Sequence, residues 1–141
     1  MENVAAEGQE EEASLYERLG GEPAISAVVD DFVGRAANDP DVNFTRQGTG
    51  REWEPTDENV AILKKHLVQL LCQSAGGPQQ YEGKELRLAH AGMQITDAEF
   101  DALVDNLVAS LDAFNVPLRE QDELLEIIES TRRDIVEAAA P

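Results

Sequence analysis

Cysteine and histidine are scarce in this chain of 141 residues, which has one cysteine and two histidines. A lone cysteine cannot form an intrachain disulfide, and Cys72 lies in a helical apolar pattern, which predicts a small buried hydrophobe. Aromatic residues make up only 5%, and the alternating pattern that is typical of strands is not sustained anywhere. No apolar run approaches the roughly 20 residues that a membrane span needs. These absences favour a soluble, helical, globular protein.

Basic residues are also few, because 11 Lys and Arg stand against 29 Asp and Glu, for a net charge of -18. Such a surface repels phosphate backbones and anionic lipid, so neither nucleic acid nor membrane is an expected partner. Residues 1–13 are rich in glutamate and contain no apolar stretch. They predict a disordered acidic tail rather than a secretory signal peptide, which makes the cytoplasm the expected compartment.

Apolar residues recur at helical spacing along most of the remaining chain, which predicts an all-α protein. Capping boxes at Ser14 and Thr96 and prolines at positions 23 and 117 mark helix starts. Gly20-Gly21 is expected to break the chain before Pro23. Residues 41–58 are predicted to form an irregular loop with Phe44 and Trp53 folded inward. The expected helices are 14–19, 23–37, 57–75, 83–91, 96–114 and 117–136.

Both histidines fall on apolar helix faces. His66 lies between Leu63 and Leu67, and His90 follows Leu86 by four residues. A buried imidazole needs a partner, because an unpaired polar group is costly to bury. A single histidine in such a place is more often a core residue bonded to a carbonyl. Two of them, on helices joined by a Gly-Gly-Pro turn, raise the chance of a shared ligand, and the pattern alone leaves both interpretations open.

A haem suits two histidines better than a zinc ion does. A structural zinc site needs four ligands at short spacing, and Cys72 does not complete such a set. The porphyrin of a haem supplies four nitrogens, so the protein provides only one or two axial ligands. Haem also needs an apolar slot and cations for its propionates. Basic side chains flank both histidines: Lys64, Lys65, Lys84 and Arg87.

Four segments resemble the truncated haemoglobins of group I. Ser14-Leu-Tyr-Glu-Arg-Leu-Gly-Gly21 and the helix 24–39 resemble the opening of that family. Ala75-Gly-Gly-Pro-Gln-Gln-Tyr-Glu-Gly-Lys84 resembles its second glycine motif, and 88–103 resembles the segment that holds its proximal histidine. The resemblance implies a truncated globin fold, a two-on-two helical sandwich around haem b. It covers a domain at 14–137, between tails at 1–13 and 138–141.

The resemblance also implies roles for individual residues. His90 falls at the proximal iron ligand, and His66 falls at a distal position that coordinates iron in some members. Val33 stands where the family usually has a tyrosine, and residues 45–58 are longer than the family's usual turn. The other residues that we expect around the haem are Phe32, Phe44, Leu63, Lys64, Leu67, Leu70, Leu71, Tyr81, Leu86, Arg87, Met93 and Ile95.

The function implied is binding of oxygen, nitric oxide or carbon monoxide at iron held by His90, with His66 as a displaceable distal ligand. Such a hexacoordinate protein suits oxygen transport, and it suits a redox or sensor role as well. Nitric oxide dioxygenation is an alternative that needs a reductase partner. A haem-free acidic helical module that binds another protein is a second alternative. The sequence does not separate carrier from enzyme, and a monomer is expected.

Overall fold

The computed structural model describes residues 13–137, which fold into helices joined by turns and one long loop. The tails predicted at 1–13 and 138–141 lie outside the described residues, except for residue 13. Within the described range the helices are α1 (Leu15–Leu19), α2 (Gly21–Ala37), α3 (Asp57–Ser74), α4 (Leu86–His90), α5 (Asp97–Ala113), α6 (Leu118–Glu129) and α7 (Arg132–Ile135).

Helix starts follow the caps that the sequence predicts. The Ser14 hydroxyl accepts a hydrogen bond from the Glu17 backbone N–H at 3.1 Å, and the Glu17 carboxylate accepts one from the Ser14 N–H. Thr96 and Glu99 make the same reciprocal pair at the start of α5. These bonds satisfy backbone donors that the first helical turn leaves without partners, so both predicted capping boxes are confirmed.

Two glycines, Gly20 and Gly21, form the turn between α1 and α2 that the sequence predicts. Gly20 has a φ of 106°, and a Cβ added to it would lie 2.8 Å from the Cβ of Ala24. Both facts require glycine at this position. The chain then enters α2 at Gly21. Gly21 also has a positive φ, of 76°, so the backbone break extends over both glycines as expected, and Pro23 lies in the first turn of α2.

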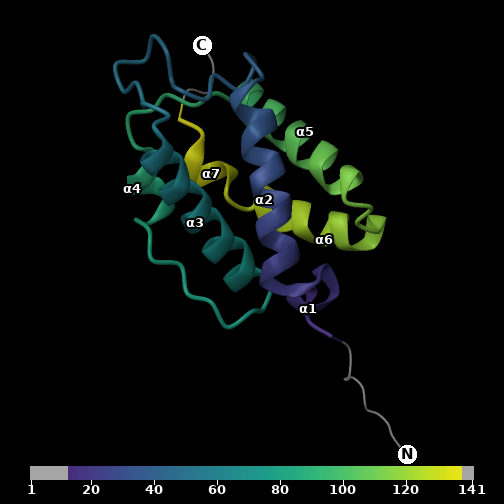
Figure 1. Cartoon of the computed structure of the whole chain (residues 1–141). Helices are drawn as coiled ribbons and strands as arrows, with labels where there is room; N and C mark the ends of the chain where they lie inside the picture. Colours follow the sequence, from purple (N-terminus) through teal and green to yellow (C-terminus); the bar gives the residue numbers. More distant parts are fainter. Residues whose placement is uncertain (1–12, 138–141) are drawn as a thin grey trace, which may run out of the picture.

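Two pairs of long helices build the core. Helix α2 lies in the middle of Figure 1, with α3 on one side and α5 on the other, and α6 packs on α1 and α5. The pair α2 and α3 thus packs on the pair α5 and α6, which is the predicted two-on-two arrangement. Cys72 is fully buried, as expected, and burial raises the pKa of its thiol to about 11. The core also contains Leu15, Ile25, Val28, Val29, Phe32, Val33, Leu71, Leu107, Leu111 and Leu124.

Two predicted helices have the wrong bounds. The helix expected over 83–91 is the short α4, because the Tyr81 hydroxyl donates to the Lys84 carbonyl at 2.6 Å and holds the preceding turn open. The helix expected to continue to 136 stops at Glu129. There the Ser130 and Thr131 hydroxyls donate to carbonyls three residues back, at 2.5 Å and 2.7 Å, and compete with the helical bonding pattern. The chain then turns into α7.

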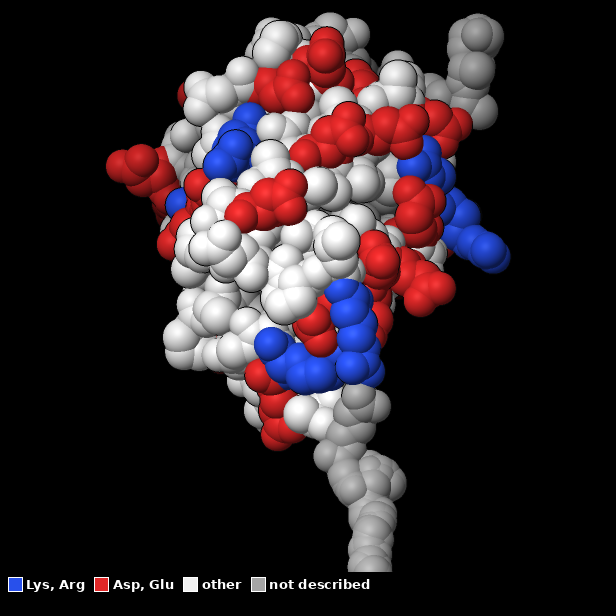
Figure 2. Space-filling model, turned by 90° about the vertical axis from the view of Figure 1, so that its right-hand side faces the viewer, with Lys and Arg blue, Asp and Glu red and all other residues white. Residues whose placement is uncertain are grey.

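Acidic side chains dominate the face of the molecule shown in Figure 2, and its basic side chains lie beside acidic ones. Arg132, for example, contacts three carboxylates and lies 4.5 Å above the ring centre of Phe100. Pairing of this kind spreads the scarce positive charge over an acidic surface. No helix among residues 13–137 is long and apolar enough to cross a membrane.

Ser110 supplies a testable link between α5 and α2. It is fully buried and donates to the Asp31 carboxylate at 2.6 Å, beside the ion pair that Asp31 makes with Arg35. Ser110→Ala should lower the free energy of unfolding at pH 7 by about 1.5 kcal/mol, measured by urea denaturation. The exposed Ser74→Ala should change it little.

The effect of Ser110→Ala should depend on pH. Hydrogen bonds from Arg35 and then Ser110 lower the pKa of Asp31 in the folded protein. Such a carboxylate stabilises the fold above its unfolded pKa, and this stability is lost as the pH falls through the folded value. The difference between the variant and the wild type should therefore shrink below about pH 4. A difference that stays constant into acid would contradict a role for the charged form.

Candidate haem site

A cavity of about 350 Å³ lies between α3, α4, α5 and the loop that follows α2. This volume is in the range of about 300–1,000 Å³ that is usual for cofactor and small-molecule sites. Both histidines of the chain line it, together with apolar side chains from five segments. Its lining residues are Val42, Asn43, Phe44, Arg46, Trp53, Asn59, Ile62, Leu63, His66, His90, Met93, Ile95, Glu99, Phe100, Leu103 and Ile135.

His90 is the last residue of α4 and is held in one ring orientation. Its Nδ1 lies 2.8 Å from the carbonyl oxygen of Leu86. A carbonyl can only accept a hydrogen bond, so the Nδ1 carries the proton and the neutral ring has its lone pair on Nε2. Metal-binding histidines typically donate their other ring nitrogen in this way, which fixes both tautomer and orientation. The arrangement suits His90 to bind a metal through Nε2.

His66 lies on α3 and is half-buried. Its ring packs edge-on against the ring of Tyr81, with centroids 5.8 Å apart. The Tyr81 hydroxyl donates to the Lys84 carbonyl, so it holds the loop and does not compete for the histidine nitrogens. His66 is thus a nitrogen donor at the wall of the same cavity as His90.

The long loop closes one side of the cavity with two aromatic rings. Phe44 and Trp53 pack edge to face, with centroids 5.3 Å apart and planes at 88°. Both rings line the cavity, as the predicted inward folding requires. Between them in sequence, Arg46 is buried and pairs with Glu99 at 2.9 Å.

Six of the residues predicted to surround the haem do line the cavity: Phe44, Leu63, His66, His90, Met93 and Ile95. The apolar residues predicted alongside them are placed elsewhere. Phe32, Val33 and Leu71 are buried in the core, and Leu67 packs against it. Leu70 and Leu86 are half-buried outside the lining. The roles predicted for these residues remain predictions.

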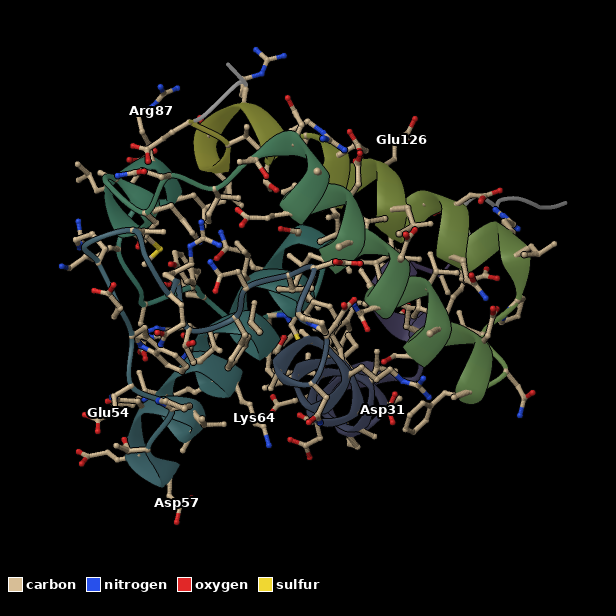
Figure 3. The ribbon with its side chains drawn as sticks, turned by 90° about the horizontal axis from the view of Figure 1, so that it is seen from above. Asp31, Glu54, Asp57, Lys64, Arg87 and Glu126 are labelled. Carbon is tan, nitrogen blue, oxygen red and sulfur yellow. The ribbon has the colours of Figure 1, made fainter. Side chains whose placement is uncertain are left out.

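Two of the cations predicted for the propionates, Lys64 and Arg87, already have carboxylate partners. Lys64 lies 3.3 Å from Asp30, and Arg87 lies 2.9 Å from Asp134. Figure 3 shows both cations at the periphery of the molecule, on different helices. Both ion pairs are exposed, so each is weak and leaves the cation able to exchange partners. Tyr81, which was also predicted to lie near the haem, is outside the cavity lining as well.

Sequence reasoning missed several lining residues. Ile135 reaches the cavity because α6 ends early and α7 changes direction. Asn59 precedes the apolar stripe of α3 by one turn, and its side-chain amide donates to the Glu54 carbonyl at 2.9 Å. Arg46 lies in a loop without periodicity, where an arginine normally indicates solvent. The apolar pattern of the last predicted helix includes Ile135, but no pattern in the sequence would place Asn59 and Arg46 inside.

A second hollow, of about 550 Å³, lies between α2, α3 and the loop after α3. It is larger, but it is lined mainly by charged and amide side chains, among them Glu22, Asp30, Lys65 and Glu82. No group of three or more His, Cys, Asp or Glu side chains in residues 13–137 is arranged to hold a metal ion. Two histidines at an apolar cavity therefore suit a cofactor that brings most of its own metal ligands.

A two-on-two helical sandwich with a carbonyl-held histidine at an apolar cavity defines a shortened globin. Residues 14–137 match the model of the family described as bacterial-like globin. A group 1 truncated haemoglobin of Tetrahymena pyriformis is 32% identical over 123 residues, 87% of this chain and 94% of that protein. One from Nostoc sp. is 35% identical over 95 residues, 67% of this chain and 73% of that protein. The chain belongs to the bacterial-like globin family, as a group 1 truncated haemoglobin.

Solved structures agree with this assignment. The truncated haemoglobin of Tetrahymena pyriformis in its Fe(III) form has a TM-score of 0.76 at 32% identity, covering 89% of this chain and 100% of that one. The 2/2 haemoglobin of Synechococcus sp. PCC 7002, crystallised with covalently attached haem, has a TM-score of 0.75 at 31% identity, covering 88% and 98%. Haem b is accordingly the cofactor, and the general function is haem-based binding of diatomic gases.

The single tryptophan offers a direct test of where the haem binds. Trp53 lines the cavity, so bound haem should quench its fluorescence by energy transfer, with saturation at one haem per chain. Titration of haem into the haem-free protein, corrected with free tryptophan for absorption of light, measures this. If the Soret absorbance saturates while the fluorescence of Trp53 is unchanged, the haem binds outside this cavity.

Proposed function

We propose that His90 binds the haem iron through Nε2 and that His66 is a second, displaceable iron ligand. A gas such as oxygen, nitric oxide or carbon monoxide would then compete with His66 for the iron. The observation that supports the proposal is that the only two histidines of the chain line one apolar cavity, with the Nδ1 of His90 committed to the Leu86 carbonyl.

The polar groups of the cavity support a special role for His66. The side-chain amides of Asn43 and Asn59 both donate to backbone carbonyls within their own segments. The Arg46 guanidinium donates to carbonyls and to Glu99. Each of these side chains is already held by hydrogen bonds, whereas Tyr81 does not compete for the nitrogens of His66. His66 is therefore the side chain best suited to bind the iron or to donate to a bound gas.

Displacement of His66 has a quantitative consequence. If only a fraction of the iron is free at any moment, the apparent affinity for a gas falls by that fraction. A protein of this kind suits sensing or redox chemistry at least as well as oxygen transport. Nitric oxide dioxygenation with a reductase remains the alternative. Turnover of nitric oxide in the presence of a reductant would distinguish that enzyme from a gas carrier.

The visible spectrum of the reduced, haem-loaded protein tests the proposal. The wild type should give the sharp, split bands of iron with two axial nitrogen ligands, and His66→Ala should give one broad five-coordinate band. Lys65→Ala, a change at the exposed neighbour, should keep the wild-type spectrum. His90→Ala should lose the split bands of iron with two axial nitrogen ligands, because only His66 remains to bind it.

Other outcomes would overturn the proposal in separate parts. A broad band in both the wild type and His66→Ala would remove His66 as a ligand and leave His90 in place. A wild-type spectrum in His90→Ala would remove His90. A haem-free interaction module, the remaining alternative, would show no saturable Soret change at all.

A further inference from the structure

The residues that follow His90 are held by side chains from two distant parts of the chain. We call residues 91–95 the proximal loop. Arg46 donates to the Met93 carbonyl from Nε at 3.1 Å and from Nη2 at 2.9 Å, and to the Gln94 carbonyl at 3.1 Å. Arg51 donates to the Ala91 carbonyl at 2.5 Å. Three carbonyls of the proximal loop are thus held by the long loop that precedes α3.

Glu137 holds the other polar groups of the proximal loop. Its two carboxylate oxygens accept hydrogen bonds from the backbone N–H groups of Gly92 and Gln94, each at 2.9 Å. Its own N–H donates to the Ile95 carbonyl at 2.9 Å. The N–H groups of Gly92 and Gln94 lower the pKa of the Glu137 carboxyl, so it is charged when it accepts them. Charged acceptors make stronger hydrogen bonds than neutral ones.

Burying Arg46 beside the proximal loop costs free energy for two reasons. Arg46 is only 5% exposed, has a φ of 57°, and needs Glu99 to balance its charge. A buried charge and a left-handed backbone both cost free energy unless the surroundings compensate them. The compensation comes from the carbonyls of the proximal loop and of Val42 and Asn43. An arrangement with these costs is typical of a site that must hold the backbone of the proximal loop in a fixed position.

Helix α4 cannot fix the position of His90 by its own packing. It has only five residues, and none of them is buried. A helix of that length is unstable alone and depends on tertiary contacts. Its neighbour in space is α7, joined to it by the exposed Arg87–Asp134 pair. The dense contacts begin one residue after His90, in the proximal loop, where the Met93 N–H also donates back to the His90 carbonyl at 3.1 Å.

We infer that Arg46 and Glu137 are positioning residues for His90, which hold the proximal loop so that the imidazole is presented to the iron at a fixed place. This inference rests on the proposed role of His90. The long loop, through Arg46, and the segment after α7, through Glu137, would thus act on the iron–histidine bond by holding the proximal loop. Groups that orient a metal ligand commonly change metal affinity by about 10–100-fold when removed.

Glu137→Ala in the full chain is the main test, because Glu137 is exposed and its loss leaves the core intact. Transfer of haem to an excess of a haem-scavenging protein should be about tenfold faster than in wild type. In the His66→Ala background, the iron–histidine stretching band of the reduced protein should shift or broaden in resonance Raman spectra. Arg46→Lys, which keeps the charge but loses the forked donor, should shift the band in the same way.

Arg18→Met is the matched control. It removes a guanidinium that pairs with Glu120 and Glu123 at 2.7 Å, at the contact between α1 and α6. It should change stability while leaving the stretching band and the haem transfer rate at the wild-type values. Glu137→Ala and Arg46→Lys variants that match the wild type or this control in both measurements would overturn the inference alone. Failure of the wild type to take up haem would overturn the proposed function as well.

Discussion

The site depends on two helices, α3 and α5, that both pack on α2 in the core at one end and are separated by a cavity at the other. On α3, Leu71 and Cys72 are buried in the core, whereas Leu63 and His66, earlier on the same helix, line the cavity. Helix α5 is divided the same way and in the same chain direction. Its Phe100 and Leu103 line the cavity, and its Leu107 and Leu111 lie in the core. Because close-packed interiors resist deformation, the packed end fixes the spacing of the open end without filling it.

This division explains which site residues the sequence could predict. The helical period identifies the face of α3 that turns inward, and it correctly selects Leu63 and His66. The same period also selects Leu67, Leu70 and Leu71, because every turn of a helix repeats the same face. Where along the helix the core ends and the cavity begins is set by the helices that cross it. This boundary is a property of the helix packing, so a periodic pattern in the sequence cannot predict it.

The loop side of the cavity was the least predictable part for a different reason. The contacts of Arg46 and Glu137 with the proximal loop join residues more than 40 positions apart. A charged residue in an irregular segment normally indicates solvent, and a left-handed arginine has no sequence signal at all. The sequence predicted the aromatic residues of this loop to fold inward because apolar surface gains from burial anywhere. Polar contacts need specific partners, so they become visible only with the fold.

The few available donors at the cavity limit how this protein can choose among gases. Diatomic gases are uncharged, so the net charge of -18 does not steer them. A displaceable His66, as proposed, would lower the affinity for every gas by the same fraction of free iron, so displacement alone could not discriminate between them. Discrimination needs an interaction that differs from gas to gas, such as a hydrogen bond that favours the more polar ligand. If His66 leaves the iron and then donates that bond, one side chain sets both the overall affinity and the preference. The apolar side chains that make up most of the cavity lining can do neither.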